Sequence, residues 1–144
     1  MIDQLQKDRA IRPDLFHFFG AIRSEKLDDW LRERKLTIPH DLKALWCETG
    51  GGDLFESETI LGPFGAKDLG DDVDTINQYL WQNGLPATWL VFHTGLDLTV
   101  VKMSSGEYVH VQKDSYKQQE TFRSLDDWYK HFIRKEYALR YGLR

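Results

Sequence analysis

The sequence predicts a single α+β domain in which a mostly antiparallel sheet is flanked by helices. Apolar residues recur at helical spacing in the N-terminal half and again after residue 124. Residues 88–112, in contrast, are rich in β-branched and aromatic residues divided by short polar turns. The length of 144 residues suits one domain, and a hydrophobic content of 41% is enough to fill one core. We therefore expect residues 1–144 to form one domain.

The N-terminal third of the chain is predicted to be helical. Ser24 is expected to cap a helix over residues 24–35, because its side-chain oxygen can accept an N–H of the first turn. Pro39 suits the first position of a second helix, where its missing N–H leaves no bond unmade. This helix is expected to end at Gly50–Gly52, because glycine adopts the left-handed conformation of a helix C-cap without strain.

The three glycines also raise the question of a phosphate-binding loop. Such a loop places its glycines before a helix, so that backbone N–H groups and the positive helix end face the anion. Here the glycines follow a helix, and no Gly-Lys-Ser/Thr sequence comes after them, only Asp53-Leu54-Phe55-Glu56. The run is therefore predicted to turn the chain.

A strand is predicted over residues 57–61, and a helix follows from Asp71-Asp72, with Ile76, Tyr79 and Leu80 at helical spacing. Three further strands are predicted within residues 88–112, and their short connections indicate an antiparallel meander. A last helix is predicted to begin at Ser124. Its expected inner face consists of Leu125, Trp128, Tyr129, Phe132, Ile133 and Tyr137.

Composition excludes several classes of protein. The net charge of −4 argues against a general nucleic-acid binder, which gains affinity from clustered Lys and Arg, and instead suits a basic partner. The only cysteine, Cys47, allows neither an internal disulfide nor a cysteine-based zinc site. The first residues lack the apolar stretch of a signal peptide, and residues 75–96, although uncharged, are too polar for a membrane helix. A cytoplasmic protein that contacts neither membrane nor nucleic acid is expected.

No residue pattern indicates catalysis. The five histidines form no compact metal-ligand motif. His93 and His110 could approach each other in the meander, where a solvated or hydrogen-bonded pair is favoured over a metal site. Paired acids at predicted helix starts are explained by the helix dipole. We therefore expect no enzyme activity, catalytic residue, metal or cofactor, and an enzyme with an unrecognised site remains the alternative.

The acidic residues after the glycines indicate a partner-binding surface. If the segments 53–58 and 68–74 are neighbours, their acids form a rim around Phe55 and Phe64 that would steer a basic partner. A merely solvated acidic surface is the alternative. Combined charge reversal at three of these acids, Asp71, Asp72 and Asp74, is expected to slow association with the partner while leaving the fold intact. The candidate contact residues are Asp53, Phe55, Glu56, Glu58, Asp68, Asp71, Asp72, Asp74 and Trp81.

The order of short motifs resembles the SUKH superfamily, which includes yeast cell-wall synthesis regulators of the Smi/Knr type and many bacterial immunity proteins. The motifs are Ile38-Pro39, Gly50-Gly51-Gly52, Thr59-Ile60-Leu61-Gly62-Pro63, Trp89-Leu90-Val91-Phe92 and the closing SLDDWYKHFI. The resemblance covers residues 29–133, so that residues 1–28 are expected to be an N-terminal helical extension. Thr49 stands where the family usually has Asn, and His93 where Gly is common.

This resemblance implies both a fold and a function. The fold would be a mostly antiparallel sheet flanked by helices. The function would be binding without turnover, most often by a cytosolic bacterial immunity protein that neutralises a toxin domain such as a nuclease. A regulatory or scaffold protein of the Smi/Knr type, which binds a cellular protein instead of a toxin, is the alternative within the superfamily.

Overall fold

The computed structural model describes residues 1–65 and 67–143 of the chain. The helices are α1 (Ile2–Ile11), α2 (Ser24–Arg34), α3 (His40–Thr49), α4 (Val73–Gln82), α5 (Leu125–Trp128) and α6 (Arg134–Arg140), with short turns η1 (Pro13–Leu15), η2 (Lys67–Leu69) and η3 (Tyr129–Ile133). The strands are β1 (Phe16–Phe18), β2 (Gly52–Leu54), β3 (Glu58–Ile60), β4 (Trp89–Thr94), β5 (Leu98–Lys102), β6 (Tyr108–Val111) and β7 (Gln118–Phe122).

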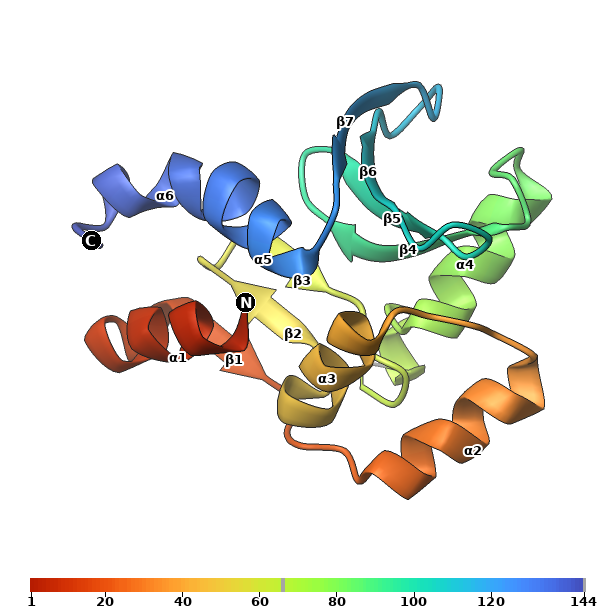
Figure 1. The fold of residues 1–144 in the computed structure, drawn as a ribbon, viewed down its shortest axis with the longest axis horizontal. Coiled ribbons are helices and arrows are strands. Elements are labelled where there is room, and N and C mark those ends of the chain that lie inside the picture. The colour runs from red at the N-terminus through yellow and green to blue at the C-terminus, as the bar shows by residue number, and fades with distance from the viewer. Residues whose placement is uncertain (66, 144) are drawn as a thin grey trace.

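These elements confirm the predicted α+β fold class. The seven strands lie side by side in sequence order, each antiparallel to the next, as an open meander (Figure 1). Strands β1, β2 and β7 were not predicted. The π-helical turn η3 joins α5 to α6, and the expected inner face of this C-terminal segment is buried except for Phe132, which is half-buried. Within the described residues, every helix is too short or too polar to span a membrane.

The N-terminal segment belongs to the same core as the rest of the domain. The prediction of an all-helical first third is wrong at β1, which pairs with β2 and forms one edge of the sheet. Asp8 of α1 is fully buried and accepts hydrogen bonds from Tyr129 Oη at 2.7 Å and Arg134 Nε at 2.8 Å. This buried charge is therefore paired, and it ties α1 to the C-terminal helices.

Three segments of the chain meet at the glycine run. Gly50 has φ 72° and ends α3 in the left-handed conformation, with its N–H bonded to Trp46 O, which confirms the predicted C-cap. A Cβ on Gly51 would lie only 2.7 Å from the Cα of Gly62. A Cβ on Gly52 would overlap the carbonyl oxygen of His17. Only glycine therefore permits the segments around His17, Gly51 and Gly62 to approach so closely.

One asparagine side chain takes the place of a strand beside β4. Strand β3 pairs with β4 only at Thr94 and His93. Further along β4, the buried amide of Asn77 accepts Val91 N–H at 2.7 Å and donates to Val91 O at 2.8 Å. A second α4 side chain, Trp81, donates to Trp89 O at 2.7 Å. Side chains of α4 thus satisfy the backbone groups that β3 leaves unpaired.

Comparing alanine substitutions at Gly51 and Gly142 separates the cost of steric overlap from the cost of backbone strain. Gly51→Ala adds both a positive-φ penalty and contact with Gly62, so we expect a loss of about 3 kcal/mol or more in the free energy of unfolding. Gly142→Ala is the matched control, because Gly142 has φ 69° and open space around its Cβ position, and about 1 kcal/mol is expected there. Urea unfolding measures both losses. Equal losses would show that the junction tolerates a Cβ.

Removing the Asn77 amide tests its strand-like role. Asn77→Ala leaves the buried N–H and C=O of Val91 without partners, so we expect a loss of about 2–4 kcal/mol in the free energy of unfolding. Asn83→Ala on the same helical segment removes an exposed amide that bonds only to Tyr79 O and is expected to cost under about 1 kcal/mol. Similar losses for the two variants would contradict this account.

Candidate partner-binding groove

The register of the meander sorts side chains onto two faces of the sheet. One cross-strand row consists of Phe18, Gly52, Ile60, His93, Thr99, His110 and Glu120. This row faces the C-terminal helices, since Trp128 Nε1 donates to Thr99 Oγ1 at 3.1 Å and the rings of His110 and Phe132 lie 4.6 Å apart. The neighbouring row, on the opposite face, consists of His17, Asp53, Thr59, Thr94, Leu98, Val111 and Gln118.

This opposite face carries a groove beside α4 and η2. A cavity of about 410 Å³ is lined by Phe19, Asp53, Thr59, Leu61, Leu69, Asp71, Ile76 and Thr94. A second cavity of about 600 Å³ is lined by Ile76, Tyr79, Leu80, Asn83, Thr94, Leu98, Lys113, Asp114 and Tyr116. The two cavities share Ile76 and Thr94 and are therefore neighbours, and we call them together the outer groove.

The lining of the outer groove mixes polar with apolar side chains, and three of the apolar ones are exposed. Leu69 is 78% exposed, Tyr79 64% and Phe19 56%, which makes them three of the most exposed large apolar side chains in the described residues. Single exposed apolar residues are ordinary on a protein surface. Three of them along one groove are instead typical of a surface that binds another molecule.

Two unpaired carboxylates flank the Phe19 end of the outer groove. Asp53 accepts a hydrogen bond from Thr59 Oγ1 at 3.0 Å, which fixes its carboxylate on the open face of the sheet. Asp71 is exposed. Neither forms an ion pair with any residue that the structure describes. Their charge is therefore available to an incoming cation, next to the apolar side chains of Phe19 and Leu69.

Two predicted contact residues, Phe55 and Glu58, are buried, and their prediction as surface contacts is wrong. Phe55 is fully buried and its ring stacks on Tyr137 with centroids 4.8 Å apart. Glu58 is 8% exposed and hydrogen-bonded to His93. Trp81 is half-buried and packs against the core while its indole N–H bonds to Trp89 O. An apolar or acidic residue in a loop can thus be buried once its loop folds onto a helix.

Two of the predicted acids have structural roles. Asp72 is 2% exposed and caps α4, since its carboxylate accepts the Thr75 N–H at 3.2 Å. Asp74 pairs with Arg34 Nε at 2.7 Å and so connects α4 to α2. The expectation that Asp71, Asp72 and Asp74 can all be reversed without loss of the fold stays a prediction, and the contacts of Asp72 and Asp74 argue against it.

The remaining predicted residues are exposed but lie outside the groove lining. Asp68 precedes Leu69 in η2, so it adds charge near the groove. Glu56 is exposed in the turn between β2 and β3 and does not line the groove. The predicted acidic rim around Phe64 is wrong, because Lys26 Nζ and Lys67 Nζ lie 4.2 Å and 5.7 Å from the centre of its ring.

His93 and His110 line one small cavity of about 210 Å³ on the helix-covered face. His93 Nε2 lies 3.2 Å from Glu58 Oε2 and Nδ1 lies 2.9 Å from Thr99 Oγ1, so both of its ring nitrogens have partners. Burial lowers the pKa of His110, and the nearby Asp97 only partly opposes this effect. No three His, Cys, Asp or Glu side chains among residues 1–65 and 67–143 are grouped as a metal site.

The groove residues that sequence reasoning missed are mainly apolar. Tyr79 was used only for the helical spacing that it shares with Ile76 and Leu80, and the structure exposes Tyr79 and buries Asn77. Phe19 was not among the predicted contact residues. Strand alternation was the available signal there, because neighbouring residues in FHFFG cannot all face the same side of a sheet.

No family model matches the chain, and comparison with curated proteins gives no match.

The pKa of His110 tests the balance of burial and charge in the small cavity. We expect an NMR titration to give a value below the ordinary 6.5, because burial disfavours the charged imidazole more than Asp97 favours it. The unfolded chain then binds more protons, so stability should fall as the pH drops below about 6.5. His110→Gln should reduce this pH dependence. A measured pKa of 6.5 or higher would mean that the Asp97 pair outweighs burial.

Proposed function

We propose that this chain is a non-enzymatic protein-binding module whose outer groove binds a partner with a basic surface. The observation that carries the proposal is the combination, in one groove, of exposed Phe19, Leu69 and Tyr79 with the unpaired carboxylates of Asp53 and Asp71. Apolar anchors provide most of the affinity in protein interfaces. Peripheral charges mainly raise the association rate and select partners of opposite sign.

The chemistry of the groove favours binding over turnover. The described groove lining contains neither histidine nor cysteine, which are the side chains most often used for proton transfer and nucleophilic attack near neutral pH. Its charged groups are Asp53 and Asp71 at one end and the neighbours Lys113 and Asp114 at the other. The Asp53 carboxylate is already held by Thr59. This arrangement suits a surface that presents charge to a partner.

Within this class, we propose that the chain is a bacterial immunity protein that inhibits a cognate toxin domain. A nuclease with a basic cleft is one toxin of the kind that this surface would suit. The resemblance to the SUKH superfamily supports this assignment, and so does the net charge of −4. Inhibition would be steric and electrostatic: the apolar side chains dock, and the carboxylates compete with the anionic substrate for the basic cleft.

Co-expression with the toxin domain encoded beside this gene tests the assignment. We expect rescue of growth and a stable complex in a pull-down. Tyr79→Arg, at an exposed position in the groove, is expected to abolish rescue while leaving the unfolding midpoint nearly unchanged. Gln78→Arg, at an exposed neighbouring position outside the groove lining, is the matched control. Binding without any effect of Tyr79→Arg would remove the outer groove from the proposal, and binding to a non-toxic protein would favour the regulatory alternative.

Neutralising the two groove carboxylates tests the electrostatic part of the proposal. Asp53→Asn with Asp71→Asn is expected to slow association with the toxin domain by about threefold or more at low ionic strength, and by less at high salt. Stopped-flow mixing measures the rate. The control, Glu107→Gln with Glu120→Gln, makes the same charge change at exposed sites outside the groove. Equal slowing in both variants would show that only net charge matters.

A further inference from the structure

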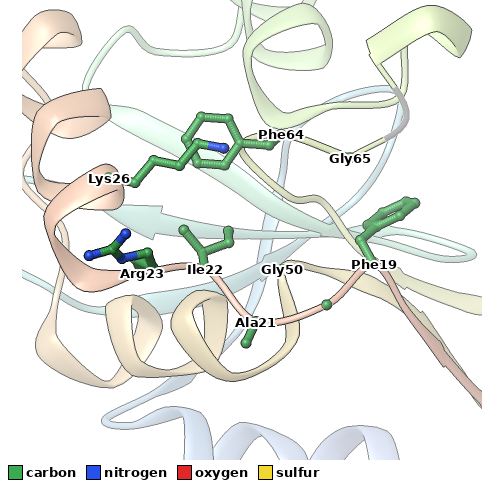
Figure 2. A pocket seen from close by; sticks show the side chains of 9 residues that line it. Phe19, Ala21, Ile22, Arg23, Lys26, Gly50, Phe64 and Gly65 are labelled. Atoms are coloured by element: carbon green, nitrogen blue, oxygen red, sulfur yellow. The ribbon is translucent and has the colours of Figure 1, made fainter.

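A further cavity, in addition to those described above, lies on the other side of Phe19, where the chain passes from β1 to α2. Its volume is about 400 Å³. Figure 2 shows Lys26 reaching across the ring of Phe64, with Phe19 on the opposite side of the opening. We call this cavity the glycine pocket, and it is lined by Phe19, Gly20, Ala21, Ile22, Arg23, Lys26, Gly50, Phe64 and Gly65.

The charge of the glycine pocket is opposite to that of the whole chain. Its charged lining residues, Arg23 and Lys26, are both cations, although the net charge of the protein is −4. Both are exposed, and neither forms an ion pair with a residue in the described part of the chain. Such a concentration of unpaired positive charge at a cavity attracts an anion. Arg23 can in addition hold a carboxylate or phosphate through two parallel hydrogen bonds.

Two aromatic rings give the pocket an apolar component. Phe19 is 56% exposed, and its ring covers Gly65 so closely that a Cβ there would overlap it. Phe64 packs edge-on against Trp30 with centroids 6.3 Å apart, and Lys26 Nζ lies 4.2 Å from the centre of its ring. Phe64 is therefore held in place by its neighbours. Rings presented in this way bind another flat ring by stacking or edge contact.

The backbone of the glycine run supplies little of the anion recognition. The Gly50 N–H donates to Trp46 O at 2.8 Å, and the Gly51 N–H donates to Thr49 Oγ1 at 3.1 Å. These donors are already used within the protein, so the run does not act as a phosphate loop. The charged groups that can recognise an anion in this pocket are therefore the side chains of Arg23 and Lys26, and the glycines leave the space open.

We propose that the glycine pocket binds a small organic anion in which an aromatic ring carries a phosphate or carboxylate group. The ring lies against Phe19 and Phe64, and the anionic group lies between Arg23 and Lys26. A volume of about 400 Å³ is within the range of small-ligand sites. This inference does not depend on the proposed protein partner, because the ligand is a free small molecule and the pocket shares only Phe19 with the outer groove.

An NMR titration of the full chain tests the proposal with three probes. Phenyl phosphate has both the ring and the anion, inorganic phosphate lacks the ring, and benzylamine has the ring with the opposite charge. We expect saturable shifts at the Gly20, Ala21 and Gly65 amides with phenyl phosphate. Binding of inorganic phosphate should be at least about tenfold weaker, and benzylamine should produce no saturable shift. Equal binding of both phosphates, or binding of benzylamine, would overturn the proposal.

Paired variants assign the effect to the two cations. Arg23→Ala with Lys26→Ala is expected to weaken phenyl phosphate binding by at least about tenfold. Arg123→Ala with Lys135→Ala removes the same charge from exposed positions outside the pocket and should change the affinity by less than about twofold. Circular dichroism checks that each variant is folded. Arg23→Glu alone offers a second test, since reversing one charge should abolish binding. Retained affinity in these pocket variants would overturn the proposal.

Discussion

The close approach of three backbone segments at Gly50–Gly52 is the constraint on which the rest of the architecture depends. The segment after β1 runs along the end of α3, where Phe19 N–H bonds to Gly51 O at 3.0 Å and Ile22 N–H to Cys47 O at 2.8 Å. The segment after β3 crosses on the other side, and Trp46 Nε1 donates to Leu61 O at 2.8 Å. Side chains at the crossing would force these segments apart. The glycine run therefore does more than end a helix, because it lets the chain pass directly from α3 into strand β2.

The same junction determines where ligands can reach the molecule. Because the chain leaves β1 along α3, Phe19 is directed away from the core and lines both the glycine pocket and the outer groove. The face of the sheet that the C-terminal helices cover carries a smaller cavity, of about 210 Å³, and its polar side chains are bonded internally, as at His93 and Thr99. Among the cavities described above, the larger ones therefore lie away from the C-terminal helices.

Local signals in the sequence were enough for the fold class but insufficient for the site. The end of α3 at Gly50 and the cap of α5 by Ser124 both follow from short-range chemistry, and both are as predicted. Strands β1 and β2 have three residues each and pair across more than thirty residues of sequence, so alternation over so short a run was too weak a signal to predict them. The sequence also did not distinguish the acids with a structural role from those exposed at the surface. Asp71 and Asp72 are adjacent in sequence, yet one is free and the other is a buried cap, a difference that only the position of α4 decides.

Once the structural roles are assigned, the outer groove and the glycine pocket differ in the charges that they present. Asp72 and Asp74 have partners within the fold, and the outer groove keeps the carboxylates of Asp53, Asp71 and Asp114 together with one cation, Lys113. Lys26 and Arg23 are the positive groups of the glycine pocket on the other side of Phe19. A basic protein surface is therefore attracted to the groove and repelled from the pocket, and a small anion experiences the reverse. The two proposed sites therefore differ in the charge of the ligand that they would attract, and they overlap at the side chain of Phe19.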